Sequence, residues 1–424
     1  MPTGPSLLEN GRLNPGFLKL DLFCKGMRIP SDCRTSDGRP VLRVRAGLGS
    51  GMEVLIPASD GIHVNVPVVE PWVQDSPYEL HGPRSNGRHW LTYDGTEIGE
   101  VILPVRPAFY DKVTRSGKPM VSVGILQGTY LGVYYGGMCA NWKDVARDNC
   151  RFCSVGENLL KGDDTTGKSA EDVAETAAAA REEGITFVHV NGGFDDTGKY
   201  LERFGPVLRR VREQTGMLTG FQVPPLWEHE QYREVKRWGV NNVSLCYEIW
   251  NPRRFEEVCP GKARRAGLAK YLDAIEFCAK EVKFDTTNGE MIAGLEAPGD
   301  SMQAIDWLTA IGAVPTVCVF RPVIGTDYAA LPPPKVEEMI PIFAHYYRRC
   351  MERGLPIGVA PNVHVSIVMN PEECRWLLPQ EDRDAYPLHR LKLAAMRKAF
   401  GAYFRTRLKL RGSAPVESPV AAVS

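Results

Sequence analysis

Residues 128–160 read GTYLGVYYGGMCANWKDVARDNCRFCSVGENLL and place Cys139, Cys150 and Cys153 in the spacing C-x10-C-x2-C. Three thiolates gathered on one loop can hold three irons of a 4Fe–4S cluster, which leaves the fourth iron without a protein ligand. A small molecule can bind to such an open iron. The stretch therefore predicts a cluster that reacts with a bound molecule, in contrast to a cluster that only transfers electrons.

Two other interpretations of these cysteines stay open. A structural zinc site needs four ligands, normally as two close pairs, and the sequence has no second C-x2-C. His189 would complete a zinc site only through folding, and in the third interpretation the cysteines hold no metal. The other cysteines follow no paired spacing, which argues against a disulfide framework. They are Cys24, Cys33, Cys246, Cys259, Cys278, Cys318, Cys350 and Cys374.

The composition is that of an ordinary globular protein, with 43% hydrophobic and 24% charged residues among 424. Lys plus Arg equals Asp plus Glu at 51 each, so no bulk charge favours nucleic acid or an anionic membrane. No apolar run approaches the length of a bilayer span, and the N-terminal residues do not resemble a secretory signal. We expect a cytoplasmic protein that binds neither nucleic acid nor membrane.

Strand and helix signals alternate after residue 119, which predicts βα units around a parallel sheet. The expected strands cover 120–135, 185–193, 218–225, 241–250, 290–297 and 314–323. The expected helices cover 169–183, 200–216, 229–239, 268–282, 301–312 and 335–354. For the first helix, Ser169 is a plausible N-cap with Asp172 completing a capping box, and Gly184 ends the helix.

The remaining segments define the expected domains. Residues 1–118 contain short β-branched runs at 41–47, 52–57, 63–71 and 97–105, which predict a β-rich N-terminal domain. Residues 119–330 form the core, and 331–412 hold the last barrel helix, an extra strand at 357–369 and a C-terminal helix at 388–410. Residues 413–424 are expected to be a disordered tail. The predicted fold class is α/β, a partial (β/α)6 TIM-like barrel with the N-terminal domain and a C-terminal helical extension.

The pair Cys150 and Cys153, with Phe152 directly before the second cysteine, resembles the end of the cysteine motif of radical S-adenosylmethionine (radical SAM) enzymes. That family usually has C-x3-C-x2-C, so the ten-residue first gap is a departure. Six βα units beginning directly before the cysteine loop are similar to the partial barrel of the family, over about residues 119–369. The resemblance implies that the three cysteines bind a 4Fe–4S cluster, and that Phe152 contributes to the binding site of SAM.

Further stretches resemble the family's SAM-binding motifs. Gly192 and Gly193 match the two glycines of a Gly-Gly-Glu motif, and Phe194 stands where the glutamate is expected. The resemblance implies that Asn191 or Asp195 serves in place of the glutamate. The other residues that the resemblance implies in SAM binding are Ile292 and Gly294 in a GxIxGxxE-like stretch, and Arg321 before a P-x-x-GT-like ending.

The fourth predicted strand carries Ser244, Cys246 and Glu248 at period two, so all three face one side. Polar side chains on the inward face of a small barrel are costly unless they bind something. The resemblance implies that Ser244 and Glu248 contact SAM, with Glu248 reaching the ribose.

The resemblance also implies the chemistry. An electron from a flavodoxin- or ferredoxin-type donor would cleave SAM to a 5′-deoxyadenosyl radical, which abstracts hydrogen from a small-molecule substrate. A rearrangement, fragmentation or C–C bond reaction in cofactor or natural-product biosynthesis is then expected, whereas the sequence identifies no catalytic residue beyond the cofactors. The alternatives are a radical SAM methyltransferase and a non-catalytic zinc- or iron–sulfur-binding protein.

The ten residues between Cys139 and Cys150 must form a loop whose two ends both lie at the cluster. Asn141 can cap a short helical turn, with Trp142 and Val145 on one face and charged residues, Asp148 among them, on the other. We predict a helix of one to two turns that packs Trp142 against the barrel and turns its charged face to solvent.

Overall fold

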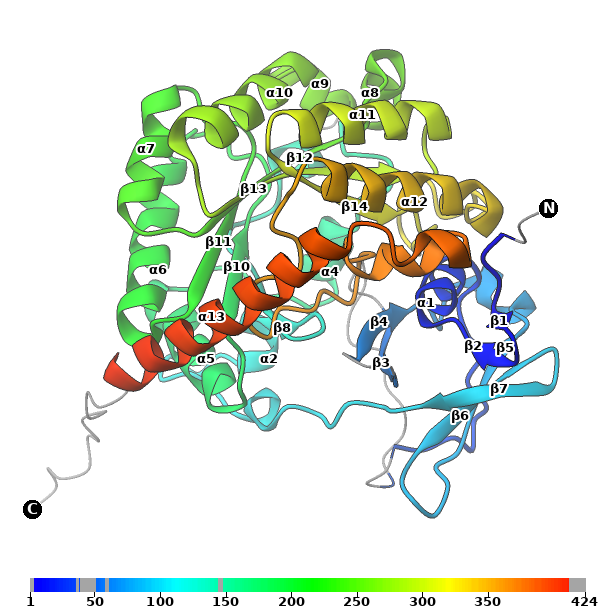
Figure 1. The fold of residues 1–424 in the computed structure, drawn as a ribbon. Coiled ribbons are helices and arrows are strands. Elements are labelled where there is room, and N and C mark those ends of the chain that lie inside the picture. The colour runs from blue at the N-terminus through cyan, green and yellow to red at the C-terminus, as the bar shows by residue number, and fades with distance from the viewer. Residues whose placement is uncertain (1–3, 36–37, 39–50, 58–60, 144–147, 412–424) are drawn as a thin grey trace, which may run out of the picture.

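The computed structural model describes residues 4–35, 38, 51–57, 61–143 and 148–411. At its centre lies a seven-stranded sheet in the order β14-β13-β12-β11-β10-β9-β8 (Figure 1). Strands β9 to β14 are parallel, whereas β8 pairs antiparallel with β9. The strands are β8 (Ile125–Leu126), β9 (Leu131–Tyr134), β10 (Phe187–Asn191), β11 (Leu218–Gln222), β12 (Asn242–Glu248), β13 (Thr286–Ala293) and β14 (Val314–Val319).

Helices connect each parallel strand to the next, as the sequence predicts. They are α3 (Ala140–Lys143), α4 (Val155–Leu160), α5 (Ala170–Glu182), α6 (Tyr200–Thr215), α7 (His229–Arg237), α8 (Pro252–Val258), α9 (Pro260–Arg265), α10 (Leu268–Phe277) with the π-turn η3 (Cys278–Val282), α11 (Pro298–Ala310) and α12 (Val336–Glu352). This arrangement confirms the α/β class and the partial (β/α)6 barrel. The sheet is an incomplete barrel, whose carboxyl edge is where ligands bind in such folds.

The burial pattern shows which side of each strand faces the barrel interior. Along β13, Thr286, Asn288 and Glu290 are half-buried, whereas the residues between them are buried beneath the outer helices. The interior of the barrel is therefore lined by a row of polar side chains at period two.

Helix α5 begins and ends where the sequence predicts. The Ser169 side chain accepts a hydrogen bond from the Asp172 amide, and the Asp172 carboxylate accepts one from the Ser169 amide. Gly184 follows the helix with φ of 88°, a conformation that suits glycine. Local capping chemistry thus sets both ends of the helix that follows the cysteine loop.

Three expectations are corrected by the structure. The predicted first strand at 120–135 is broken into the helical turn α2 (Met120–Val123) and the hairpin β8–β9, because Gly128 turns the chain at φ of 75°. The predicted strand at 357–369 is an irregular segment that makes one isolated bridge, Gly128 to Val365. The N-terminal region also contains a helix, α1 (Pro15–Lys25), which is buried along most of its length.

The N-terminal region is otherwise rich in short strands. They are β1 (Leu8–Glu9), β2 (Arg12–Leu13), β3 (Met52–Ile56), β4 (Ile62–Val66), β5 (Tyr78–His81), β6 (His89–Tyr93) and β7 (Thr96–Val101), with short helices η1 (Pro71–Asp75) and η2 (Ala108–Asp111). The predicted run at 41–47 lies outside the described residues. All of these pairings are antiparallel hairpins, in keeping with the β-rich composition of this region.

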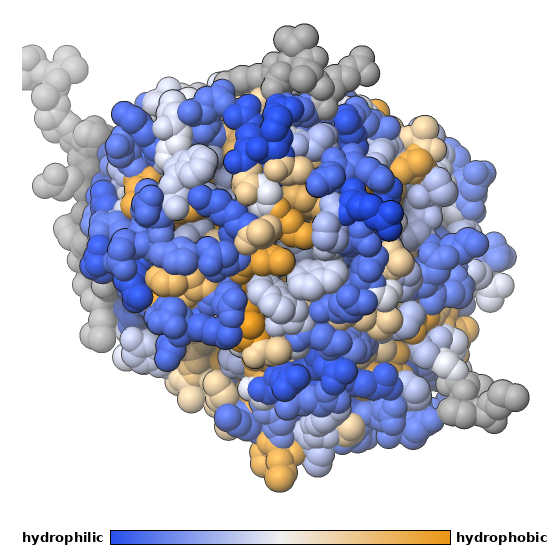
Figure 2. Space-filling view, turned by 90° about the horizontal axis from the view of Figure 1, so that it is seen from above, coloured by the Kyte–Doolittle hydropathy of each residue, from blue (hydrophilic) through white to orange (hydrophobic). Residues whose placement is uncertain are grey.

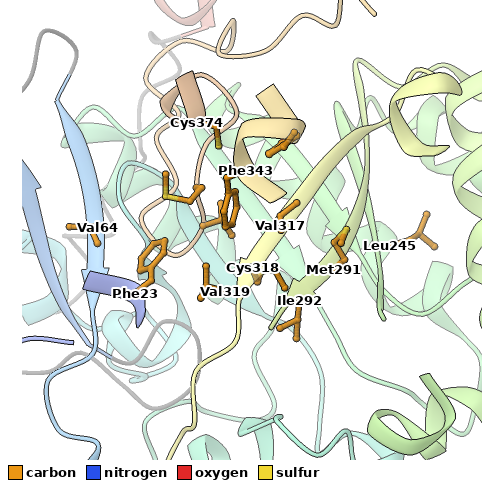
Figure 3. Packing of buried hydrophobic residues seen from close by; sticks show 14 of the residues in the cluster. Phe23, Val64, Leu245, Met291, Ile292, Val317, Cys318, Val319, Phe343 and Cys374 are labelled. Atoms are coloured by element: carbon orange, nitrogen blue, oxygen red, sulfur yellow. The ribbon is translucent and has the colours of Figure 1, made fainter. Parts of the chain in front are cut away.

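The N-terminal region packs against the edge strand β14 and shares its core (Figure 3). Phe23 of α1 lies between Val64 of β4 and Val319 of β14 in this view. The fully buried Lys19 of α1 pairs with Glu373 at 2.7 Å. Apolar packing and a buried ion pair therefore join residues that are far apart in the sequence.

The C-terminal part contains η4 (Glu373–Leu377), η5 (Gln380–Asp382) and the long helix α13 (Pro387–Arg411), which runs diagonally across the barrel in Figure 1. Residues 412–424, including the predicted tail, lie outside the described residues. Seen from above, most of the surface is hydrophilic, with apolar residues showing near its middle (Figure 2). Among the described residues, no helix has the length and apolar character needed to cross a membrane.

Candidate functional site

A cavity of about 260 Å³ opens at the carboxyl ends of the parallel strands, and we call it the upper cavity. It brings together eight of the residues that the sequence predicts at the site. They are Cys139, Cys150, Phe152, Cys153, Asn191, Gly192, Gly193 and Glu248. The first four come from the cysteine loop after β9, the next three follow or end β10, and Glu248 ends β12.

The glycines after β10 allow the cysteine loop to pass close to the sheet. A Cβ at Gly193 would lie 2.9 Å from the Sγ atom of Cys139 and 2.7 Å from its Cβ atom, which no side chain can tolerate. The Ala140 amide donates to the carbonyl of Phe194 at 2.8 Å. The backbone after β10 and the loop around Cys139 are therefore held against one another, and a larger residue at 193 would separate them.

The helical turn predicted after Cys139 is present as α3, and its remainder at 144–147 lies outside the described residues. Trp142 is half-buried and lies across Gly156 of α4, where even a Cβ atom would overlap the indole ring. One detail of the prediction is wrong. Asp148 does not face solvent, since it is buried and paired with Arg264 of α9.

The close cysteine pair lies deeper than Cys139. The Cys153 amide donates to the Cys150 carbonyl at 3.0 Å, which makes a tight turn. A hydrogen bond from Cys259 lowers the pKa of Cys150, whereas burial raises the pKa of Cys153. Among the described residues no three His, Cys, Asp or Glu side chains converge closely enough to hold a metal ion. The three thiols thus border one cavity but do not lie close enough together to bind one metal ion in this arrangement.

The donors that border the upper cavity fit an iron–sulfur cluster better than a hard metal ion. Three thiols are soft ligands that suit iron–sulfur clusters or zinc, whereas oxygen ligands suit magnesium and calcium. The backbone of Gly192 and Gly193 also lines the cavity, and the positions of their missing side chains are occupied by Phe204 and Cys139. The cavity therefore has a side of soft ligands and a side of glycine backbone.

Glu248 lies at the boundary of the upper cavity in an unusual conformation. Its φ is 71°, and a bulge between Cys246 and Glu248 shifts the register of β12 against β13. The Lys262 ammonium donates to the Glu248 carboxylate at 2.6 Å and also to the Cys246 carbonyl. Backbone strain in a non-glycine residue persists only when its surroundings hold it in place, and such residues cluster at functional sites.

Lys262 carries a positive charge at the cavity. Burial lowers its pKa, but Glu248 together with Tyr271, Cys150 and Cys259 outweighs that effect, so the net pKa is raised. Its Nζ atom also lies 5.5 Å from the centroid of the Tyr271 ring. The lysine is therefore a fixed cation beside Cys246 and Glu248.

Glu290 of β13 is a second acidic group of the cavity. Burial and the negative charge of Glu248 raise its pKa from 4.5 to about 7. Two thiols flank its carboxylate, with Cys318 at 3.8 Å and Cys246 close by. The Oγ of Ser244 donates to it at 3.4 Å. Glu290 can therefore hold or release a proton near neutral pH.

Four predicted cofactor-binding residues lie elsewhere. Ser244 lines a second cavity beneath the first, which we call the lower cavity. Ile292 is buried in the core, and Gly294 packs against Pro334. Arg321 is buried at the contact with the N-terminal region, where it donates to Asn65 and lies over the Phe23 ring.

Sequence reasoning missed several residues of the upper cavity. They are Tyr134, Gln222, Lys262, Tyr271 and Glu290. The sequence could have predicted Glu290 in the barrel interior, because Asn288 and Glu290 alternate with small or apolar residues just as the polar residues of β12 do. No sequence pattern predicts the position of Lys262, since its role depends on how α9 packs beside the end of β12.

Comparisons with known proteins give one relative by sequence and several by structure. No protein-family model matches the chain. It is 24% identical over 290 residues to the bacteriochlorophyllide c C-7(1)-hydroxylase of Chlorobaculum limnaeum, and the match covers 63% of this chain and 72% of the hydroxylase.

Two solved structures illustrate the likeness in fold. Methylornithine synthase gives a TM-score of 0.41 at 14% identity, with 52% of this chain and 62% of that chain covered. Coproporphyrinogen III oxidase of Escherichia coli, a radical SAM enzyme, gives a TM-score of 0.36 at 14% identity, with 55% of each chain covered.

The sequence relationship is to the hydroxylase, and the solved structures show a likeness in fold alone. The half-barrel and the cysteine loop at its carboxyl edge are observed in this chain itself. The assignment to the radical SAM enzymes, the 4Fe–4S cluster, SAM and the residues that would hold them stay predictions.

Proposed function

We propose that Cys139, Cys150 and Cys153 hold a 4Fe–4S cluster in the upper cavity, and that SAM binds beside it. The enzyme then removes a hydrogen atom from a small-molecule substrate. A flavodoxin- or ferredoxin-type protein supplies the electron. The observation that carries this proposal is that all three cysteines of the C-x10-C-x2-C motif line one cavity with Asn191, the two glycines and Glu248.

The bound cofactors supply a strongly oxidising carbon radical, and the chain's own residues position and protect the reaction. Asn191 and the glycines offer backbone and amide groups to the amino acid part of SAM. Glu248, held by Lys262, offers a carboxylate to a hydroxyl group of SAM. The α3 turn and α4 cover the cavity from outside, with Trp142 seated on Gly156, and so limit the entry of water.

SAM cleavage tests this function without knowledge of the substrate. The anaerobically purified enzyme, given dithionite and SAM, should release 5′-deoxyadenosine and methionine. Cys153→Ala should abolish both products, and Cys33→Ala, which changes a cysteine of the N-terminal region, should retain them. Formation of S-adenosylhomocysteine instead would indicate a methyltransferase. Zinc without iron in the purified protein would indicate a non-catalytic zinc site.

A second candidate concerns the reaction that follows. The relative is a hydroxylase of bacteriochlorophyllide c, which favours replacement of a C–H bond by C–OH. Such a reaction is a two-electron oxidation. The 5′-deoxyadenosyl radical would take a hydrogen atom from the substrate, the 4Fe–4S cluster would take one further electron, and water would supply the hydroxyl group while releasing a proton. Incubation of the reduced enzyme with SAM and bacteriochlorophyllide c tests it. A product heavier by one oxygen atom, labelled in heavy-oxygen water, supports hydroxylation, and unchanged pigment excludes this substrate.

A further inference from the structure

The lower cavity lies at the amino ends of the parallel strands, beneath the upper one, and measures about 260 Å³. Residues at the starts of β10 to β14 form its sides. The segment 360–370 and Phe400 of α13 contribute the remaining wall. The proposed function assigns no role to this space, although it occupies the interior of the same barrel.

One wall of the lower cavity is aromatic. The rings of Phe187 and His189 stack at 5.8 Å between centroids, with 25° between their planes. Tyr130 lies edge-on to His189 at 6.2 Å, and Phe400 lines the cavity from α13. Val363, Val365 and Val368 add aliphatic surface. Walls of this kind favour a flat, apolar ring system.

One polar atom on this wall is set apart from the rest. The Nε2 atom of His189 is buried and makes no hydrogen bond with the described residues. Burial lowers the pKa of His189 to about 4, so the imidazole is uncharged at neutral pH. A buried polar atom without a partner is costly, and a ligand with a hydrogen-bonding edge would remove that cost. The neutral imidazole can form a hydrogen bond to such an edge without placing a charge beside the ligand.

The size of the cavity limits the ligand. An apolar cavity of about 150 Å³ accommodates benzene, so the lower cavity accommodates about two fused rings. The amide of Asn242 donates to Asn288 and to the Thr286 carbonyl, so these polar groups of the wall are largely satisfied by one another. Their mutual pairing leaves the His189 imidazole as the main recognition point.

Glu290 connects the two cavities. Among the described residues it is the one side chain that lines both of them. A molecule seated in the lower cavity would therefore present its upper end beside Glu290, facing the cysteine loop. This position suits a substrate whose reacting carbon must meet a radical formed above it.

We propose that the lower cavity binds the body of the substrate, a planar, uncharged aromatic group of about two fused rings with a hydrogen-bonding edge that meets His189. The substrate's reacting carbon lies next to Glu290. This inference rests on the proposed function, because it assigns the substrate class for the same active site. It is an alternative to the bacteriochlorophyllide candidate, because a tetrapyrrole macrocycle is larger than two fused rings.

Binding of 5-fluoroindole to the full-length protein, followed by fluorine NMR, tests the proposal. We expect saturable binding to the wild-type protein. Val363→Phe fills the cavity and should weaken binding at least about tenfold, the equivalent of about 1.4 kcal/mol. His189→Leu should weaken the binding of 5-fluoroindole several-fold. The binding of indene, which lacks the N–H group, should stay nearly unchanged. Val155→Phe, which fills the upper cavity, should have no effect on either ligand.

Several outcomes would overturn the proposal. Non-saturable binding of 5-fluoroindole, or equal affinity in the Val363→Phe protein, would show that the lower cavity is not the site. Val363→Ala enlarges the cavity and should still bind 5-fluoroindole. This second variant keeps the site testable if the Val363→Phe protein does not fold. In the wild-type protein, absence of saturable probe binding with normal SAM cleavage refutes only this inference. Normal probe binding without SAM cleavage refutes only the proposed function.

Discussion

At the scale of single residues, Glu248 has a strained backbone and an ion pair with Lys262. A left-handed conformation at a non-glycine residue costs about 1–3 kcal/mol and needs support from its surroundings. The lysine supplies that support, because it binds both the carboxylate and the carbonyl two residues earlier. The side chain is thereby held at the boundary of the upper cavity, in a fixed orientation toward a ligand.

Glu248→Gln should retain the iron–sulfur cluster and weaken SAM binding. The change keeps the shape of the side chain but removes the charge, and a lost charge-assisted hydrogen bond is worth about 1–3 kcal/mol. Calorimetric titration with SAM measures the effect. Glu276→Gln, on the half-exposed outer face of α10, is the matched control. Unchanged SAM affinity in Glu248→Gln would show that another residue makes the hydrogen bond to SAM.

Glu290 predicts a pH dependence of stability. Its pKa of about 7 in the folded protein lies above the ordinary 4.5, so folding favours the protonated form. The stabilising contribution is fully present below about pH 4.5 and is lost as the pH rises through about 7. The melting temperature of Glu290→Gln should therefore rise relative to that of the wild type as the pH increases from about 5 to about 8. A difference in melting temperature that stays constant over this range would contradict the assignment.

At the scale of elements, the cysteine loop depends on contacts made by short helices. Trp142 of α3 covers Gly156 of α4, and Gly261 of α9 donates its amide to the Asp148 carbonyl at 3.0 Å. These contacts connect the long first gap of the motif to two different helices. The long gap is thus anchored at both described ends.

Trp142→Ala should lower the amount of iron retained during anaerobic gel filtration without removing a ligand. The physical reason is that the indole packs α3 onto α4 and so positions Cys139 relative to the close pair. Trp227→Ala changes a tryptophan that is 63% exposed and serves as the control. Equal iron retention in both variants would show that the packing of Trp142 does not support the cluster.

The elements that local patterns specify were predictable, and those that depend on tertiary contact were not. The period-two and helical patterns, with the Ser169 cap, predict the six βα units because each signal lies within its own segment. The β8–β9 hairpin escaped prediction, since its apolar residues on both sides of Gly128 look like one long strand. Helix α1 is buried on nearly all sides, so no helical periodicity distinguishes it.

The same distinction holds for the site. Cysteine spacing and the glycines after β10 predicted the part of the upper cavity that these two segments line, because sequence spacing restricts where neighbouring residues can lie. The part played by Lys262 and the actual place of Arg321 depend on partners distant in the sequence. Such partnerships leave no pattern in a single sequence.

At the scale of the whole molecule, the N-terminal region and segment 360–370 cover the open side of the half-barrel. The Asn65 amide donates to the Ser366 carbonyl at 2.9 Å, and the Thr129 amide donates to the His364 carbonyl at 3.0 Å. The segment therefore lies between β4 and the β8–β9 turn. This cover closes part of the barrel interior, which the proposed radical chemistry would require.

The buried pair Lys19–Glu373 connects the N-terminal helix to this cover. Lys19→Met should destabilise the protein by about 3–5 kcal/mol, because it leaves the Glu373 carboxylate buried without its charge partner. Lys112→Met removes one side of an exposed pair with Glu182 and should change stability by less than about 0.5 kcal/mol. Denaturant unfolding measures both. A small effect of Lys19→Met would show that the pair is not needed to hold the N-terminal helix.

Iron and sulfide content of the anaerobically reconstituted protein shows whether Cys139, Cys150 and Cys153 hold the cluster. The cysteine triad predicts about four irons and four sulfides per chain in the wild-type protein and in Cys24→Ala. Cys139→Ala, Cys150→Ala and Cys153→Ala should each lose the cluster and its brown colour. Full cluster content in Cys139→Ala would contradict the account, because it would show that the residue before the ten-residue gap is not a ligand.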